Sequence, residues 1–296
     1  MNNQLNIPVG ISDFKKIREN DYYYIDKSGL IKELLKRESA EVTLITRPRR
    51  FGKTMGMSML AHFFDIRSDN RRLFDGLEIT RDEALCGAWM NQYPVVFLTL
   101  KDIDGLTFED AYERLAVQIS NLYKEHAYLL ESERMDSDDR TLFKELKSGS
   151  AGKIRVGQSL HTMSTALKDN TTLRFAVITG CLKIAKESIF TGTNNFVSDN
   201  ITDSRFNEYF GFTQEEVDQI LTDANVSGKA EEVKRWYYGY HFGRFDVYCP
   251  WDVMNYMRDL QQNPEAAPAS RKRNKNKKMQ VTVSYITVTC IFLFIA

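Results

Sequence analysis

Apolar positions along the chain fall into two patterns that repeat in turn. Short continuous runs rich in β-branched residues predict buried strands at Val42–Ile45, Tyr93–Leu100 and Arg174–Thr179. Helical spacing is found in the segments around them: Leu30, Ile31, Leu34 and Leu35; Met55, Met59, Leu60, Phe63 and Phe64; and the long stretch Phe108–Leu130. Strands separated by helices predict an α/β fold with a mainly parallel sheet and flanking helices.

Polar and mixed segments suggest how the chain is organised. Residues 131–158 are polar and are expected to form a surface loop. From Thr213 two helical patterns follow, and Thr213 with Glu216 fits a capping box. We therefore expect an internally shortened α/β domain at residues 1–204, a small helical, lid-like subdomain at 205–262, and a linker, basic run and apolar tail at 263–296.

The tail has an unusual composition. RKRNKNKK carries six basic residues in eight and precedes MQVTVSYITVTCIFLFIA, residues 279–296. As a helix this stretch would span about 27 Å, the short limit for a membrane anchor, and its polar residues weaken that interpretation. It is alternatively a basic arm, or an out-of-frame C-terminus, which we favour.

Composition adds few constraints. The chain has 296 residues, is 43% hydrophobic, and balances 40 basic against 40 acidic residues, so net charge does not indicate nucleic acid as a partner. Four dispersed cysteines form neither a disulfide framework nor a zinc motif. The N-terminus lacks the pattern of a signal peptide, which favours a cytoplasmic protein, with membrane association through the tail as the alternative.

The stretch TRPRRFGKT, residues 46–54, provides the clearest chemical motif. Gly52, Lys53 and Thr54 follow a predicted strand and enter a predicted helix, as in G-x-x-x-x-G-K-[ST], but Arg47 replaces the first glycine. Such a loop points backbone N–H groups at phosphate, and its lysine reaches the β/γ-phosphates. The motif and its setting therefore predict nucleotide binding.

Several ordered stretches resemble a family of bacterial AAA-ATPase-like proteins. These are P-loop ATPases related to the signal-transducing NTPases, and many carry a C-terminal PD-(D/E)XK nuclease-like domain. The similar stretches are IPVGISDF, YIDK, RPRRFGKT, PVVFLTLKD, RFAVITGCLKIAKESIFTGTNNF, FNEYFGFTQEEV, WYYGYHFG and DVYCPWDVMNY, which cover roughly residues 5–262. An Arg-Pro-Arg-Arg start is the usual form of the loop in that family.

The resemblance implies a P-loop NTPase-like α/β fold that carries an ATP site with Mg²⁺. It implies that the loop contacts phosphate and that Thr54 binds the metal. Thr179, at the end of a strand, would take a sensor role, followed by the basic Lys183. The nucleotide-binding residues expected on this basis are Arg47, Arg49, Arg50, Phe51, Gly52, Lys53, Thr54, Thr179 and Lys183.

The acidic strand of such ATPases is missing. Between Glu131 and Arg174 there is no run of four apolar residues, and this stretch joins two pieces that the resembled family separates by several tens of residues. Asp102 and Asp104 are the nearest substitutes, but neither directly ends an apolar strand. We therefore assign no catalytic residue. We also expect that the strands at Tyr93–Leu100 and Arg174–Thr179 either pair directly or keep open edges.

The remaining candidates favour packing over chemistry. His241 and the aromatic residues of WYYGYHFG are expected in the core of the helical subdomain, and Trp251 beside a helix-opening Pro250 is expected to pack. The sequence thus predicts an ATP-binding protein with weak or absent hydrolysis, in which a protein partner or oligomer is possible. The alternative is a non-catalytic interaction or tail-anchored module whose loop is only structural.

Overall fold

The computed structural model describes residues 4–36, 42–100, 103, 106–131, 136–159, 173–181, 196–203, 205–268 and 288–295. The helices are α1 (Phe14–Glu19), α2 (Gly29–Leu35), α3 (Lys53–Phe64), α4 (Glu83–Trp89), α5 (Phe108–Glu125), α6 (Ser137–Ser148), α9 (Gln214–Asp223), α10 (Ala230–Tyr237) and α11 (Pro250–Gln262). The strands are β1 (Val42–Thr46), β2 (Val95–Leu98), β3 (Leu173–Gly180), β4 (Phe196–Asp199), β5 (Tyr240–Phe242), β6 (Phe245–Val247) and β7 (Val288–Ile295).

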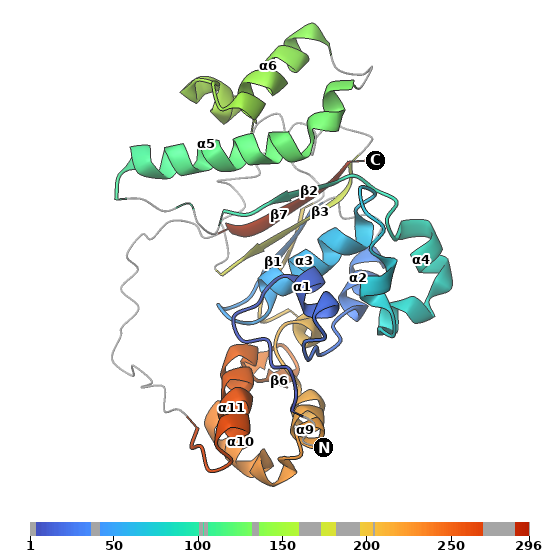
Figure 1. Cartoon of the computed structure of the whole chain (residues 1–296), viewed down its shortest axis with the longest axis vertical. Coiled ribbons are helices and arrows are strands. Elements are labelled where there is room, and N and C mark those ends of the chain that lie inside the picture. The colour runs from blue at the N-terminus through green and yellow to red at the C-terminus, as the bar shows by residue number, and fades with distance from the viewer. Residues whose placement is uncertain are drawn as a thin grey trace.

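The central sheet has the order β2-β7-β3-β1-β4. β1 pairs in parallel with both β3 and β4, so three neighbouring strands end at the same edge. Helix α5 and, farther out, α6 lie beyond one face of this sheet, while α1, α2 and α3 lie on the other (Figure 1). The mixed α/β architecture with a parallel core is the fold class predicted from the sequence.

The central sheet contains two strands that the sequence patterns do not predict, β4 at its edge and β7 in its interior. β7 lies between β2 and β3 and is antiparallel to both, with Phe292 opposite Phe97 on one side and Val177 on the other. The expectation that β2 and β3 pair directly or keep open edges is therefore wrong, because β7 supplies backbone partners to each. The same strand corrects the helical-anchor alternative over residues 288–295. No helix in the described ranges has the length and apolar character that crossing a bilayer requires.

The main core lies between the sheet and α1–α4. It includes Ile45 of β1, Val177 of β3 and the buried face of α3, which are joined by a network of edge-to-face ring contacts around Phe63, Phe64 and Phe74. This packing fixes the start of α3 against the end of β1. The segment between them is the predicted phosphate loop.

Residues 131–158 correct a second expectation. They are not simply a loop, because Ser137–Ser148 form α6 and residues 153–159 are also helical. Asp136 caps α6 by accepting hydrogen bonds from the backbone N–H groups of Asp138 and Asp139. Phe143 and Leu146 then pack on α5, with the Phe143 ring 4.7 Å from that of Tyr123. A correct N-cap and two apolar positions on one face suffice for a helix in this polar segment.

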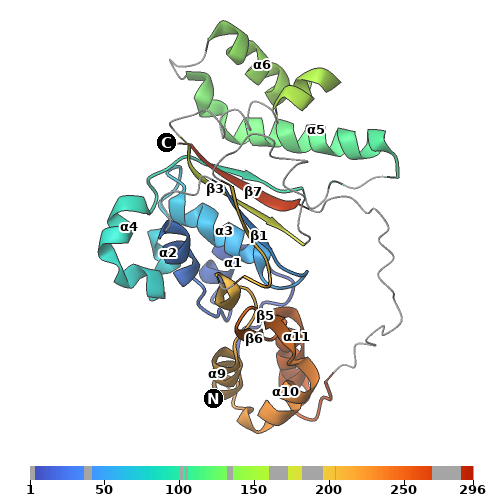
Figure 2. The same ribbon diagram turned by 180° about the vertical axis from the view of Figure 1, so that it is seen from behind.

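Residues 205–262 contain α9, α10, α11 and the β5–β6 hairpin, which lie together below the sheet in both views (Figures 1 and 2). The predicted capping box of α9 is confirmed, with hydrogen bonds in both directions between Thr213 and Glu216. The packing expected for WYYGYHFG is correct only in part. Phe242 is buried, but Trp236, Tyr238 and Tyr240 each expose more than a third of their surface, and His241 is exposed beside Asp246.

Candidate nucleotide site

Two residues of the loop between β1 and α3 have backbone angles that residues other than glycine rarely adopt. Gly52 caps α3 with φ of +80°, and Arg50 also has a positive φ, +74°. Glycine adopts this left-handed conformation without steric cost, whereas arginine requires support from its surroundings. The first N–H groups of the 12-residue helix α3 come directly after this turn. A helix N-terminus that follows a tight turn is a favourable site for an anion.

Lys53 is the first residue of α3, and its side chain extends back to the loop. Its side chain is buried, and Nζ donates hydrogen bonds to the carbonyl oxygens of Arg47 at 2.9 Å and Pro48 at 2.7 Å. These bonds hold the ammonium group inside the turn and keep the loop wrapped around it. Thr54 follows and lines the adjoining cavity. Gly52, Lys53 and Thr54 thus lie together at the start of α3 and line the cavity.

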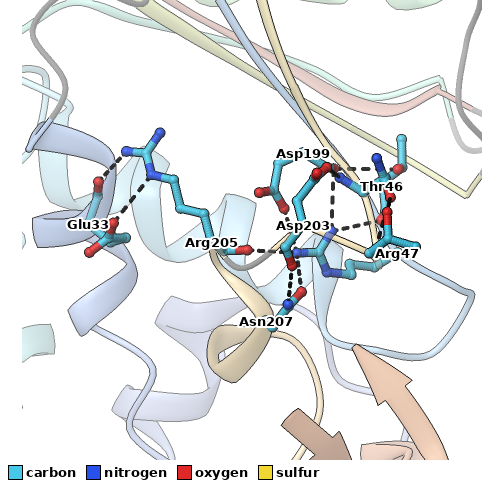
Figure 3. Close-up of polar contacts among 9 residues, drawn as sticks. Glu33, Thr46, Arg47, Asp199, Asp203, Arg205 and Asn207 are labelled. Carbon is cyan, nitrogen blue, oxygen red and sulfur yellow. Dashed lines mark hydrogen bonds and ion pairs between the residues drawn. The ribbon is translucent and has the colours of Figure 1, made fainter. Parts of the chain in front are cut away.

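Arg47 lies in a different setting from the expected one. Its side chain is fully buried, and its guanidinium donates to Asp199 Oδ1 at 2.6 Å, Asn207 Oδ1 at 2.8 Å and the carbonyl of Arg205 at 3.1 Å (Figure 3). It also lies between the rings of Phe210 and Phe242, at 5.6 and 5.7 Å. These contacts direct the charge toward β4 and residues 205–210 rather than into the cavity beside Lys53.

The Arg47–Asp199 ion pair ties three segments together. Burial raises the pKa of the Asp199 carboxyl, and the hydrogen bond from Arg47 opposes that rise. Arg205 extends the network, because its guanidinium bonds to both the side chain and the carbonyl of Glu33 in α2 (Figure 3). The position that carries a glycine in the general motif is therefore used here to join the loop to β4 and, through Arg205, to α2.

Arg50 and Phe51 connect the loop to the elements of residues 205–262. Phe51 is 1% exposed and packs with the hairpin, at ring distances of 4.8 Å from Tyr240 and 5.0 Å from Phe242. The guanidinium of Arg50 lies 4.9 Å from the ring centre of Trp251 in α11. Arg49 is exposed and lines the cavity. Of the three loop arginines, Arg49 and Arg50 are thus at the cavity and Arg47 is not.

The sequence predicts a sensor role for Thr179. It is buried at the end of β3, opposite Ile45 of β1 and opposite Cys290 of β7 in the strand register. Among the described residues, its Oγ1 has no hydrogen-bond partner. A buried hydroxyl without a partner costs free energy, and a ligand oxygen nearby would satisfy it. Lys183, Asp102 and Asp104 lie outside the described residues.

A cavity of about 560 Å³ opens beside the loop. Its walls come mainly from four places: the N-terminal segment at residues 8–12 and 23–27, the loop with the start of α3, residues 209–212, and the face of α11 that carries Trp251. The volume is in the range of small-molecule sites. The cavity therefore adds a largely apolar chamber next to the phosphate loop, large enough for more than a phosphate group.

Lys27 also lines this cavity, and its side chain is held by several hydrogen-bond acceptors. Its ammonium donates to both carboxylate oxygens of Glu216 at 2.5 and 2.7 Å and to the carbonyl of Glu208 at 2.5 Å. Burial lowers the pKa of Lys27, and the attraction of Glu216 opposes that fall. Because Glu216 also belongs to the capping box of α9, one carboxylate joins the N-terminal segment to that helix. Sequence comparison singled out the YIDK element but not this role.

Among the described strands of the central sheet, Asp199 of β4 is the one acidic residue, and it is paired with Arg47. β7 lies between β2 and β3. It begins opposite Gly180, at the sheet edge from which β1 leads into the loop. Residues 279–296 contain no Asp or Glu, so this replacement strand carries backbone groups but no acid. Within the described ranges there is no cluster of three side chains suited to a metal. The Thr54 hydroxyl fits a single Mg²⁺ ligand, with other ligands coming from phosphate and water.

Comparison with known proteins supports the family suggested by the loop and the fold. The model of the family described as "Predicted AAA-ATPase" matches residues 8–156, half of the chain, including β1, the loop and α3. An uncharacterized protein in the vnfD 5' region of Azotobacter chroococcum mcd 1 is 31% identical over 274 residues. The alignment covers 84% of this chain but 51% of that protein, so the chain spans about half the length of this relative. No solved structure matches. The chain belongs to the predicted AAA-ATPase family.

Proposed function

We propose that this protein binds ATP in the cavity beside the loop at residues 47–54 and hydrolyses it weakly or not at all. The observation that carries the proposal is the position of Lys53. Its buried ammonium is held inside a loop that ends parallel strand β1 and opens α3, and that loop borders a cavity of about 560 Å³.

The binding chemistry follows from the groups around Lys53. Phosphate oxygens would accept hydrogen bonds from the first N–H groups of α3 and from the lysine ammonium, which now donates to two loop carbonyls. Thr54 would provide one ligand to Mg²⁺, which when bound neutralises phosphate charge. Arg47 takes no part in this proposal as a phosphate ligand.

Weak hydrolysis follows from β7. P-loop ATPases position the attacking water with an acidic residue near the γ-phosphate. The strand that occupies that place here has no acidic residue, and Asp199, at the end of β4, is already paired with Arg47. The proposal is therefore one of binding without efficient turnover.

Replacement of Lys53 by alanine tests the proposal. Because charge-assisted hydrogen bonds contribute about 1.5–3 kcal/mol, we expect the Kd for a fluorescent ATP analogue to rise roughly tenfold to a hundredfold. The exposed Lys144 on α6 offers a matched control, and Lys144→Ala should leave the titration unchanged. If neither variant alters binding, or if the unmodified chain does not bind the analogue, the loop is structural and the interaction-module alternative is favoured.

A further inference from the structure

The cavity beside the phosphate loop is lined by positive charge with no negative charge among it. Its lining includes Lys27, Arg49, Arg50 and Lys53, and the described residues that border it include no Asp or Glu. Cations gathered around a partly enclosed space attract anionic ligands. These four cations are not equally free to contact a ligand, and their existing bonds show which one is.

Three of the four cations already have partners within the protein. Lys27 is bonded to a carboxylate of α9, and Lys53 donates to two loop carbonyls. Arg50 lies over the ring of Trp251. Arg49 is exposed, and within the described ranges no hydrogen bond, ion pair or ring contact engages its guanidinium. Arg49 can therefore offer all five N–H donors to a ligand without breaking a bond inside the protein.

The place of Arg49 in the loop brings it close to the Lys53 ammonium. Lys53 Nζ lies 2.7 Å from the carbonyl oxygen of Pro48, and Arg49 is the residue joined to that carbonyl group. By standard peptide geometry, the Arg49 Cα is then within about 6 Å of Nζ. The lysine of such a loop reaches the β- and γ-phosphates. An arginine side chain that starts so near can contact the same end of the phosphate chain.

We infer that Arg49 binds the terminal phosphate of the nucleotide and makes the site prefer a triphosphate over a diphosphate. The N–H groups at the start of α3 are fixed by the helix and serve phosphates that both nucleotides carry. A third phosphate adds oxygens that accept paired hydrogen bonds from the planar guanidinium. This inference rests on the proposed function, and it adds to that function which class of nucleotide is retained.

The test compares ADP with the β,γ-imido analogue of ATP, which keeps three phosphates and resists hydrolysis. Both are used to displace a fluorescent nucleotide with Mg²⁺ present and at low ionic strength, because salt screens an exposed arginine. Arg49→Ala should weaken binding of the triphosphate about tenfold and that of ADP by less than about twofold, since a charge-assisted bond is lost only with the former. Arg72→Ala removes an exposed arginine that does not line the cavity and should change neither Kd.

The outcomes separate this inference from the proposed function. Because the Arg49 side chain is exposed, Arg49→Ala should unfold at the same urea concentration as the unmodified chain, so a change in affinity reports on binding. An unchanged ratio of the two Kd values in Arg49→Ala, including an equal loss of both nucleotides, overturns the role of Arg49 while Lys53-dependent binding still stands. Absence of binding of either nucleotide by the unmodified chain overturns both proposals.

Discussion

A chain carrying Phe292→Pro is expected to unfold at a much lower urea concentration than the unmodified chain, and to aggregate at concentrations where that chain stays dispersed. Phe292 lies in the middle of β7, opposite Phe97 and Val177, so its strand has neighbours on both sides. Proline removes the N–H donor and cannot be accommodated in an inner strand. Each backbone group left without a partner costs about 1–3 kcal/mol, and opened edges on β2 and β3 would promote association.

Urea denaturation and size-exclusion chromatography measure both effects. Ala267→Pro serves as the matched control, because this residue is exposed in the irregular segment after α11. A Phe292→Pro chain as stable and as monodisperse as the control would show that β7 does not complete the sheet in solution.

The second large effect is expected at Arg47. Arg47→Ala should lower the free energy of unfolding by about 3–5 kcal/mol, because it leaves Asp199 and Asn207 buried without their partner. Lys15→Ala, which breaks the exposed pair with Glu19, should change it by less than about 1 kcal/mol. Urea denaturation of the two variants measures the difference.

A double variant separates a structural role of Arg47 from phosphate binding. Arg47→Met with Asp199→Leu removes both charges and should recover much of the stability lost in Arg47→Ala, as apolar replacements of buried pairs often do. The account of Arg47 would be wrong if Arg47→Ala unfolded like the unmodified chain yet lost nucleotide affinity.

Local patterns were sufficient to predict the elements around the site. The apolar run at Val42–Ile45 gave β1, the glycine and lysine before a helical pattern gave the start of α3, and Thr213 with Glu216 gave the cap of α9. These features depend on residues a few positions apart, so each can be read from a short window. The family itself followed from many such windows in a consistent order.

Features that depend on distant residues could not be predicted in this way. β7 pairs with strands more than a hundred residues earlier, and its β-branched, apolar composition fits a strand equally well wherever a sheet has room for one. Arg47 resembles a phosphate ligand in the sequence, since nothing near it shows that Asp199 and Asn207 will enclose its guanidinium.

The fate of bound ATP tests the central claim most directly. Purified protein in excess over ATP labelled in the γ-phosphate, with Mg²⁺ present, should hold nucleotide that is recovered as intact ATP after prolonged incubation, while Lys53→Ala retains much less. Stoichiometric release of labelled phosphate within minutes, abolished by Lys53→Ala, would show that the site completes hydrolysis without an acid on β7 and would contradict binding without turnover.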